Sequence, residues 1–143
     1  MAASSEACTR PELKPAELIR VAAGVLRDAS GRILIAQRPA GRHAAGFWEF
    51  PGGKIQADES PLQALGRELT EEIGICVEAA SPLLCYQHPY PERIVELHVY
   101  AVSRYTGVAR GIEGQALRWV LPAELPSAGI LEADRPIVEL LMS

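Results

Sequence analysis

The stretch RELTEEIGI at residues 67–75 places three glutamates, Glu68, Glu71 and Glu72, within five positions. Like charges this close repel one another and lower local stability. One interpretation is an ordinary solvated acidic face of a helix. The other is a site for a hard divalent cation, because Mg²⁺ takes oxygen ligands and is shared between carboxylates and substrate phosphates. The residues around the stretch decide between the two.

A helix over residues 61–73 is expected to carry these glutamates. Ser60 is a helix-starting residue, Pro61 suits the first turn, and Gly74 suits the end. At about 100° per residue, the glutamates then share an arc of about 100°. The apolar residues that we expect to pack on a sheet form a separate narrow stripe: Leu62, Leu65, Leu69 and Ile73.

Apolar runs bounded by turn residues predict the other elements. A hairpin is expected where ASG at 29–31 separates two such runs, and the strand in AGFWEFPGG at 45–53 runs into a loop. The predicted strands are 19–28, 32–38, 77–90, 93–105 and 115–120, and the last helix is 134–142. This order predicts an α/β (α+β) layered domain with a mixed sheet.

The length of 143 residues suits one domain with a single core. We expect a flexible N-terminal tail over 1–18 and a folded domain over 19–143. The tail has no basic start followed by an apolar block, so no secretion signal is predicted. No apolar run approaches the roughly 20 residues of a membrane-spanning helix, so no membrane association is expected.

Charge and cysteine content restrict the partners. The net charge of −4 argues against a surface for duplex nucleic acid but not against a nucleotide, whose phosphates a metal can screen. Cys8, Cys76 and Cys85 are odd in number and lack metal spacing, which predicts reduced thiols in a cytoplasmic protein. His88 and His98 lie in predicted strands and receive no functional role.

The spacing around the glutamates is distinctive. From Gly53 to Ile75 the chain reads G-x5-E-x7-R-E-U-x-E-E-x-G-U, where U is an aliphatic residue, and every fixed position is met. This pattern resembles the signature of the Nudix hydrolases. The resemblance implies an α/β/α sandwich with a mixed β-sheet. It also implies hydrolysis of a nucleoside diphosphate linked to another group, with Mg²⁺ or Mn²⁺ as the cofactor.

The resemblance implies a role for each acidic position. Glu68 and Glu72 would be metal ligands, Glu71 a ligand or a water-orienting residue, and Gly52 a ligand through its backbone carbonyl. The cation would polarise phosphoryl oxygens, lower the pKa of a bound water and screen the substrate.

The catalytic base differs among Nudix enzymes. Glu68 is favoured here, and Glu113 in GIEGQ is an alternative base, an additional metal ligand or a plain loop acid. Arg67 and Glu59 would stand behind the ligands, with the guanidinium fixing carboxylates through a charge-assisted fork.

A narrower resemblance extends over roughly residues 19–141. The segments GRILIAQR, GFWEFPGGKI, PYPER, EGQALRW and EADRPIVELL run in the order found in MutT-like enzymes. Those enzymes hydrolyse nucleoside triphosphates, notably oxidised dGTP (8-oxo-dGTP), to the monophosphate and pyrophosphate. The resemblance therefore implies nucleotide-pool sanitation, and we expect a monomer or weak dimer.

The same resemblance implies a nucleotide pocket. Arg38 and His43 would reach the phosphate and sugar, and Phe50 would pack against the base. The other residues implied for substrate binding or lining are Gly53, Tyr90, Arg93 and Leu97. His43 is otherwise a loop histidine, and Phe50 and Leu97 are otherwise core residues.

Asp134 departs from the MutT-like pattern, which has asparagine there. An amide both donates and accepts hydrogen bonds, whereas an ionised carboxylate only accepts. Asp134 would face a purine O6 unfavourably unless protonated, or it would accept from the exocyclic amine of cytosine. A third interpretation is a cap for the last helix. The alternative substrates are therefore CTP, dCTP or 5-modified pyrimidine nucleotides. A non-catalytic binding module would predict a broken signature, and this signature is intact.

Overall fold

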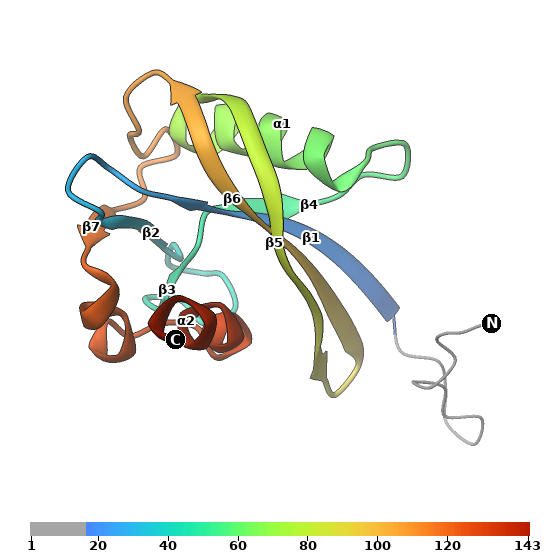
Figure 1. Ribbon diagram of the computed structural model, residues 1–143. Coiled ribbons are helices and arrows are strands. Elements are labelled where there is room, and N and C mark those ends of the chain that lie inside the picture. The colour runs from blue at the N-terminus through green and yellow to red at the C-terminus, as the bar shows by residue number, and fades with distance from the viewer. Residues whose placement is uncertain (1–16) are drawn as a thin grey trace.

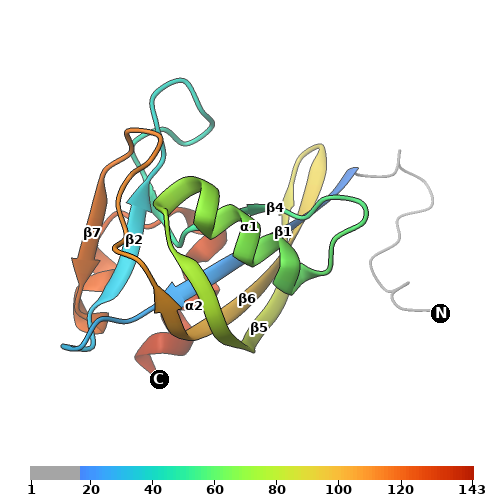
Figure 2. The same cartoon turned by 90° about the horizontal axis from the view of Figure 1, so that it is seen from above.

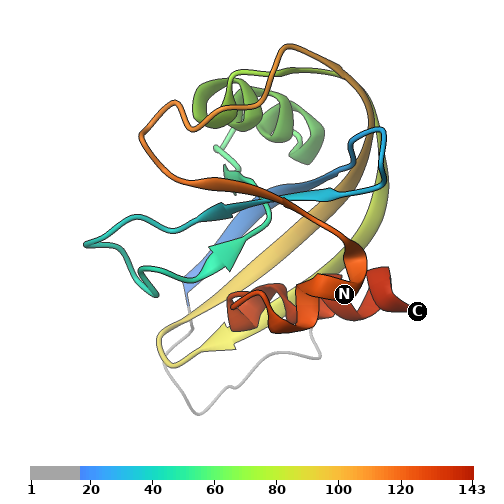
Figure 3. The same cartoon turned by 90° about the vertical axis from the view of Figure 1, so that its left-hand side faces the viewer.

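The computed structural model describes residues 17–143, in which two α-helices flank a layer of strands (Figures 1 and 3). The helix α1 lies on one side of the layer and α2 on the other, which confirms the predicted sandwich. The strands are β1 (Glu17–Leu26), β2 (Ile33–Gln37), β3 (Trp48–Glu49), β4 (Gly52–Lys54), β5 (Cys76–Tyr90), β6 (Arg93–Thr106) and β7 (Leu117–Val120). The helices are α1 (Pro61–Ile73), the 3₁₀ segments η3 (Pro122–Ser127) and η4 (Glu132–Asp134), and α2 (Arg135–Met142).

The main sheet has four strands in the order β4-β1-β6-β5. β1 runs parallel to β6 and antiparallel to β4, and β5 runs antiparallel to β6, so the sheet is mixed as predicted. The predicted strand pair around PYPER is confirmed, with Tyr90 opposite Arg93 at its tip. β5 is an edge strand, which allows it to contain Pro82 and Pro89.

The predicted hairpin of 19–28 with 32–38 was wrong beyond its turn. A single bridge joins Arg27 to Ile33, and β2 then enters a separate antiparallel sheet of order β3-β2-β7. The reason is that β4 and β6 occupy both edges of β1. The stretch 45–53 is also divided between the sheets, because β3 belongs to the second sheet and β4 to the first.

The core has two parts on the two faces of the strand layer. Residues under α1 include Ala22, Leu26 and Leu34, and residues on the α2 side include Ala23 and Val25. Alternate residues of β1 therefore point to opposite faces, as strand geometry requires. β2 is buried on both faces, which explains its uninterrupted apolar sequence.

The helix α1 begins and ends as predicted. Ser60 Oγ accepts from the Gln63 N–H, and the Gln63 side chain accepts from the Ser60 N–H, which forms a capping box. Gly74 ends the helix with φ of 73°. The predicted apolar stripe needs one correction, because Leu62 is exposed. Ala64 is buried instead, since it lies nearer the face that meets the sheet.

The predicted tail lies mostly outside the described residues. β1 begins at Glu17, which pairs with Arg93, so the strand starts two residues before the expected domain boundary. Within residues 17–143, no helix is both long enough and apolar enough to cross a membrane.

One glycine within α1 and one at its C-terminal end predict opposite effects of the same substitution. A Cβ at Gly66 would meet no heavy atom within 4 Å, so Gly66→Ala should raise the free energy of unfolding by about 0.5–1 kcal/mol. Gly74 has a positive φ, so Gly74→Ala should lower it by about 1–2 kcal/mol. Urea denaturation of both variants checks the pair. Equal effects would contradict the assigned helix end.

Candidate active site

Arg67 organises the acidic cluster on α1. Its Nε donates to Glu59 Oε2 at 2.6 Å and its Nη2 to Glu59 Oε1 at 2.9 Å. This two-pronged pairing fixes both side chains, because a guanidinium matches the geometry of a carboxylate. Hydrogen bonds from Arg67 and from the Gln56 N–H hold the pKa of Glu59 down at about 2. Glu59 therefore remains ionised at neutral pH.

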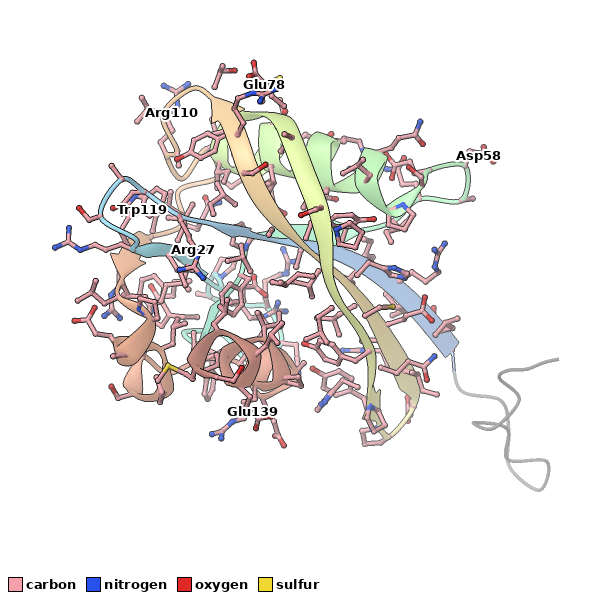
Figure 4. All side chains as sticks on the ribbon, viewed as in Figure 1. Arg27, Asp58, Glu78, Arg110, Trp119 and Glu139 are labelled. Atoms are coloured by element: carbon pink, nitrogen blue, oxygen red, sulfur yellow. The ribbon has the colours of Figure 1, made fainter. Side chains whose placement is uncertain are left out.

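The same guanidinium reaches the helix glutamates. Nη1 donates to Glu68 Oε2 at 3.0 Å and to Glu71 Oε1 at 3.3 Å, and Nη2 donates to the Lys54 carbonyl at 3.0 Å. Arg67 thus ties α1 to β4 and to the loop before the helix, which Asp58 marks in Figure 4. Glu71 is the most exposed of these carboxylates, at 57%.

Gly53 makes room for the Glu68 carboxylate. A Cβ on Gly53 would collide with the carboxyl carbon and both carboxylate oxygens of Glu68. A Cβ on Gly52 would collide with the Ala22 carbonyl of β1. The two glycines of PGGK therefore permit two close approaches, one between strands and one between β4 and α1.

Glu72 lies outside the reach of Arg67. Burial and the neighbouring Glu68, which also shares a hydrogen bond with Glu72, raise the pKa of Glu72 to about 8. Glu113 and Glu49 raise it further. The Glu72 carboxyl is thus the member of the cluster that lacks a compensating cation in the described chain.

The loop between β6 and β7 is fastened to the end of α1. The Ile112 N–H and the Gln115 side-chain amide both donate to the Glu72 carbonyl, at 3.1 Å and 3.0 Å. Gln115 also accepts from the Glu113 N–H, which places that exposed glutamate beside the cluster. Figure 4 marks this loop at Arg110. The role of Gln115 was not predicted, because it depends on a contact 43 residues away.

The donor set fits a Mg²⁺-type cation. Within residues 17–143, no group of three or more His, Cys, Asp or Glu side chains is already arranged to hold a metal ion. Mg²⁺ does not need such a cage, because it commonly uses one or two carboxylates together with waters and substrate phosphates. Glu68 and Glu72 provide such a pair of adjacent oxygen donors, one of them hard to ionise without a cation.

An open cleft of about 540 Å³ lies between the β2–β3 loop, the tip of β5 and the segment before α2. Figure 2 shows that loop projecting from the body of the molecule. Of the predicted pocket residues, His43 and Tyr90 line the cleft. The lining residues that were not predicted are Ala44, Phe47, His88, Ile130, Leu131, Glu132 and Arg135. Of these residues, Phe47 could have been predicted most readily from the sequence, because it is an aromatic residue in a Gly-rich loop, and it is exposed in the structure.

Aromatic rings form one wall of this cleft. The rings of His43 and His88 meet the Tyr90 ring edge-to-face, with centroids 5.5 Å and 4.8 Å away. The Arg93 guanidinium lies 5.0 Å from the Tyr90 ring centroid. Arg93 therefore supports Tyr90 by a cation–π contact and is not among the cleft lining residues.

Arg38 supports the loop that borders the cleft. Its Nε donates to the His43 carbonyl at 2.6 Å, and its Nη1 donates to Glu49 at 2.8 Å. Burial raises the pKa of Glu49, although Arg38 opposes the shift. Glu49 was not predicted as a site residue, because nothing in its local sequence indicates that both Glu72 and Asp134 feel its charge.

Phe50 and Asp134 meet beneath the surface. The Phe50 N–H donates to Asp134 Oδ2 at 3.0 Å, and the Phe50 side chain lies in the hydrophobic core. Leu97 is also a core residue. Asp134 makes no side-chain cap to α2, so the capping interpretation was wrong, because its carboxyl turns toward β3 instead.

Asp134 is the one buried charged residue of the described chain, with 5% of its surface exposed. Burial raises the pKa of Asp134 to about 7, although the hydrogen bond from Phe50 opposes the shift. Near neutral pH the carboxyl therefore exists in both forms, one of which donates a hydrogen bond.

Comparisons with known proteins agree with this geometry. A family model described as NUDIX domain matches residues 22–140. The chain is 40% identical to a protein of Escherichia coli strain K12 named CTP pyrophosphohydrolase, over 89% of this chain and 93% of the relative. It is 39% identical to a protein of Haemophilus influenzae named 8-oxo-dGTP diphosphatase, over the same shares.

A solved structure of a MutT protein is similar to this chain in both fold and sequence. It comes from a study of MutT from Aliivibrio salmonicida and Vibrio cholerae, and it superposes with a TM-score of 0.77 at 35% identity. The match covers 87% of this chain and 97% of the other.

The raised pKa of Asp134 predicts how stability depends on pH. Between the ordinary aspartate value of about 3.9 and about 7, the folded protein holds a proton that the unfolded chain has released. The contribution of the Asp134 carboxyl to the free energy of unfolding is therefore fully present below about pH 4, and it is lost as the pH rises to about 7. The slope is at most about 1.4 kcal/mol per pH unit.

Asp134→Asn isolates this contribution, because its amide oxygen can still accept from the Phe50 N–H. We expect the stability difference, variant minus wild type, to rise from pH 4 to 7 in urea titrations. The difference removes contributions from other groups, such as Glu72. A difference independent of pH would show that Asp134 ionises normally.

Proposed function

This chain belongs to the Nudix family of hydrolases, and from that premise we propose that it hydrolyses nucleoside triphosphates to the monophosphate and pyrophosphate with Mg²⁺. The observation that carries this proposal is the arrangement around Arg67. One guanidinium holds Glu59 and Glu68 in place while Glu72 stays uncompensated beside Glu68. The nucleotide would occupy the adjoining cleft, and the reaction would take place in the cytoplasm.

Each residue of the cluster has a distinct task in this proposal. Glu68 and Glu72 hold the cation, with Glu71 and the Gly52 carbonyl as further ligands. When bound, the cation screens the phosphates, polarises a phosphoryl oxygen and lowers the pKa of a bound water. Arg67 and Glu59 keep the ligands in position.

Glu68 is our choice of base for the attacking water. Arg67 engages its Oε2 only, which leaves Oε1 able to take a proton. Glu113 is exposed and fastened to α1 through Gln115, so it serves as the alternative base or as a further ligand. Both residues lie beside Glu72, where the attacked phosphate would be held.

The substrate that we favour is 8-oxo-dGTP. A protonated Asp134 can donate to O6 of an oxidised guanine, as an amide would, and its burial favours that form. This removes the objection that an ionised carboxylate would repel O6. His43 and Tyr90 would then contact the base or sugar within the cleft.

A second candidate substrate is a cytosine nucleotide. The ionised form of Asp134 accepts from the exocyclic amine of cytosine. The 40% identical relative named CTP pyrophosphohydrolase supports this candidate. The two substrates require opposite ionisation states of the same carboxyl, which makes them separable by pH.

Removing either cation ligand should abolish most activity without unfolding the protein. We expect Glu68→Gln and Glu72→Gln each to lower kcat by at least about a hundredfold, because the amide removes charge at the cation. The midpoint temperature of thermal unfolding should be unchanged or higher, since each substitution relieves repulsion between carboxylates. Glu139→Gln, on the outer face of α2 (Figure 4), is the matched control and should keep normal activity. Near-normal rates in both variants would refute the metal assignment.

Substrate choice and its pH dependence test Asp134. We expect a higher kcat/KM for 8-oxo-dGTP than for dGTP, CTP or 5-methyl-dCTP at pH 7. The ratio of 8-oxo-dGTP to 5-methyl-dCTP should fall as pH rises through about 7, because ionisation replaces the donor with an acceptor. A ratio cancels pH effects on steps that both substrates share.

Asp134→Asn provides the control for this experiment, since its amide does not ionise. The variant should show a ratio independent of pH and shifted toward 8-oxo-dGTP. A wild-type ratio that is equally flat would exclude Asp134 as the residue that reads the base. A preference for cytosine nucleotides at pH 7 would select the second candidate.

A further inference from the structure

Cys85 and His98 lie side by side on the main sheet, outside the acidic site. They are directly opposite each other in the antiparallel pair β5–β6, with Cys85 Sγ 3.7 Å from His98 Nδ1. Neighbouring Leu97 and Val99 point into the core on the α2 side, so His98 points to the opposite face. Cys85 is exposed on that face.

Glu96 fixes the histidine from behind. His98 Nε2 lies 2.7 Å from Glu96 Oε2, and Arg20 and Gln87 also donate to this carboxylate. Although partial burial opposes it, hydrogen bonds from His98 and Gln87 hold the pKa of Glu96 below its ordinary value. An ionised carboxylate only accepts, so Nε2 carries the hydrogen, and the lone pair of neutral His98 at Nδ1 faces the sulfur.

There is open space in front of the pair. Cys85 and His98 both line a shallow cleft of about 290 Å³, together with Pro82, Leu84 and Tyr100. The β5–β6 register shifts between Pro82 and Leu84, just before Cys85. Such a bulge redirects the strand and its side chains. The cleft offers room for an ion and its waters.

We propose that Cys85 and His98 bind a thiophilic divalent cation such as Zn²⁺, with Glu96 as the partner that orients the histidine. Zn–S bonds of about 2.3 Å and Zn–N bonds of about 2.0–2.1 Å at a tetrahedral angle place sulfur and nitrogen about 3.5 Å apart. The separation of 3.7 Å is therefore close to that of two ligands on one ion. A carboxylate on the second ring nitrogen is the usual support of a zinc-bound histidine.

The alternative use of such a trio is a nucleophilic cysteine, and the surroundings oppose it. Partial burial and the charge of Glu96 raise the pKa of the Cys85 thiol, which disfavours the thiolate that a nucleophile needs. A cation reverses this preference, because the thiol proton leaves to solvent as the Zn–S bond forms. The remaining coordination positions belong to water, since Glu96 lies behind the ring and does not converge on the ion.

Cobalt spectroscopy separates this site from the acidic one. Co²⁺ replaces Zn²⁺, and only a thiolate ligand gives the near-ultraviolet sulfur-to-cobalt charge-transfer band, which carboxylates do not produce. The full-length protein is reduced, saturated with Mg²⁺ to occupy the acidic cluster, and titrated with Co²⁺. We expect the band to saturate at one equivalent and to disappear when Zn²⁺ is added.

Matched variants assign the ligands. Cys85→Ser should abolish the band, whereas Cys76→Ser and Cys8→Ser should retain it; Cys76 is exposed on the same strand. His98→Gln should weaken the apparent affinity for Co²⁺ more than tenfold, and Glu96→Gln about tenfold or more. Circular dichroism confirms that each variant is folded.

The outcomes are decisive and independent of catalysis. A missing band in wild type, or one that persists in Cys85→Ser, would overturn the proposal. Loss of the band in Cys76→Ser or Cys8→Ser would move the site elsewhere and overturn it equally. Glu68→Gln should leave the band unchanged, so failure of the proposed hydrolase function would not affect this result.

Discussion

The pairing of Arg67 with Glu59 is the interaction on which the acidic site depends. Two short hydrogen bonds lock the guanidinium, and its remaining donors then hold Glu68, Glu71 and the backbone of Lys54. An unconstrained arginine side chain would pair with any of several carboxylates, whereas the guanidinium held by Glu59 keeps its positive charge at one position. This contact therefore links β4, the loop after it and α1 at the acidic site.

One positive charge does not neutralise this cluster. Arg67 compensates the glutamates it touches, and the excess charge accumulates at Glu72, whose carboxyl resists ionisation. The structure tolerates this repulsion because the opposite face of α1 is anchored by Leu65, Leu69 and Ile73, all fully buried. Packing energy from the apolar face thus supports an acidic face that would otherwise destabilise the helix.

Local sequence patterns predicted where the helices and strands of this protein lie better than they predicted which strands pair in a sheet. The start of α1 at Ser60, its end at Gly74 and the strand pair around PYPER follow from short stretches, because their hydrogen bonds join nearby residues. The departure of β2 into a second sheet was missed, because it depends on β6 occupying an edge of β1. The acidic cluster was predicted from the spacing of its glutamates, because residues three or four positions apart lie on the same face of a helix.

Contacts between distant segments escaped prediction for the same reason. Gln115 reaches α1 across 43 residues, and Cys85 meets His98 only through the register of β5 with β6. The aspartate at position 134 was identified from sequence, but its depth was not, because burial is a property of the whole fold. That depth matters most, since it turns a residue that accepts hydrogen bonds into one that also donates them.

Glu49 links Asp134 electrostatically to the acidic site. Its negative charge raises the pKa of Glu72 on one side and of Asp134 on the other, and Arg38 is its ion-pair partner. Arg38 in turn holds the loop that carries His43 to the cleft. A change in charge at Glu49 therefore reaches both the carboxyl that would bind the cation and the carboxyl that would read the base. The two halves of the site share one partly buried ion pair, and both respond to the charge of Glu49.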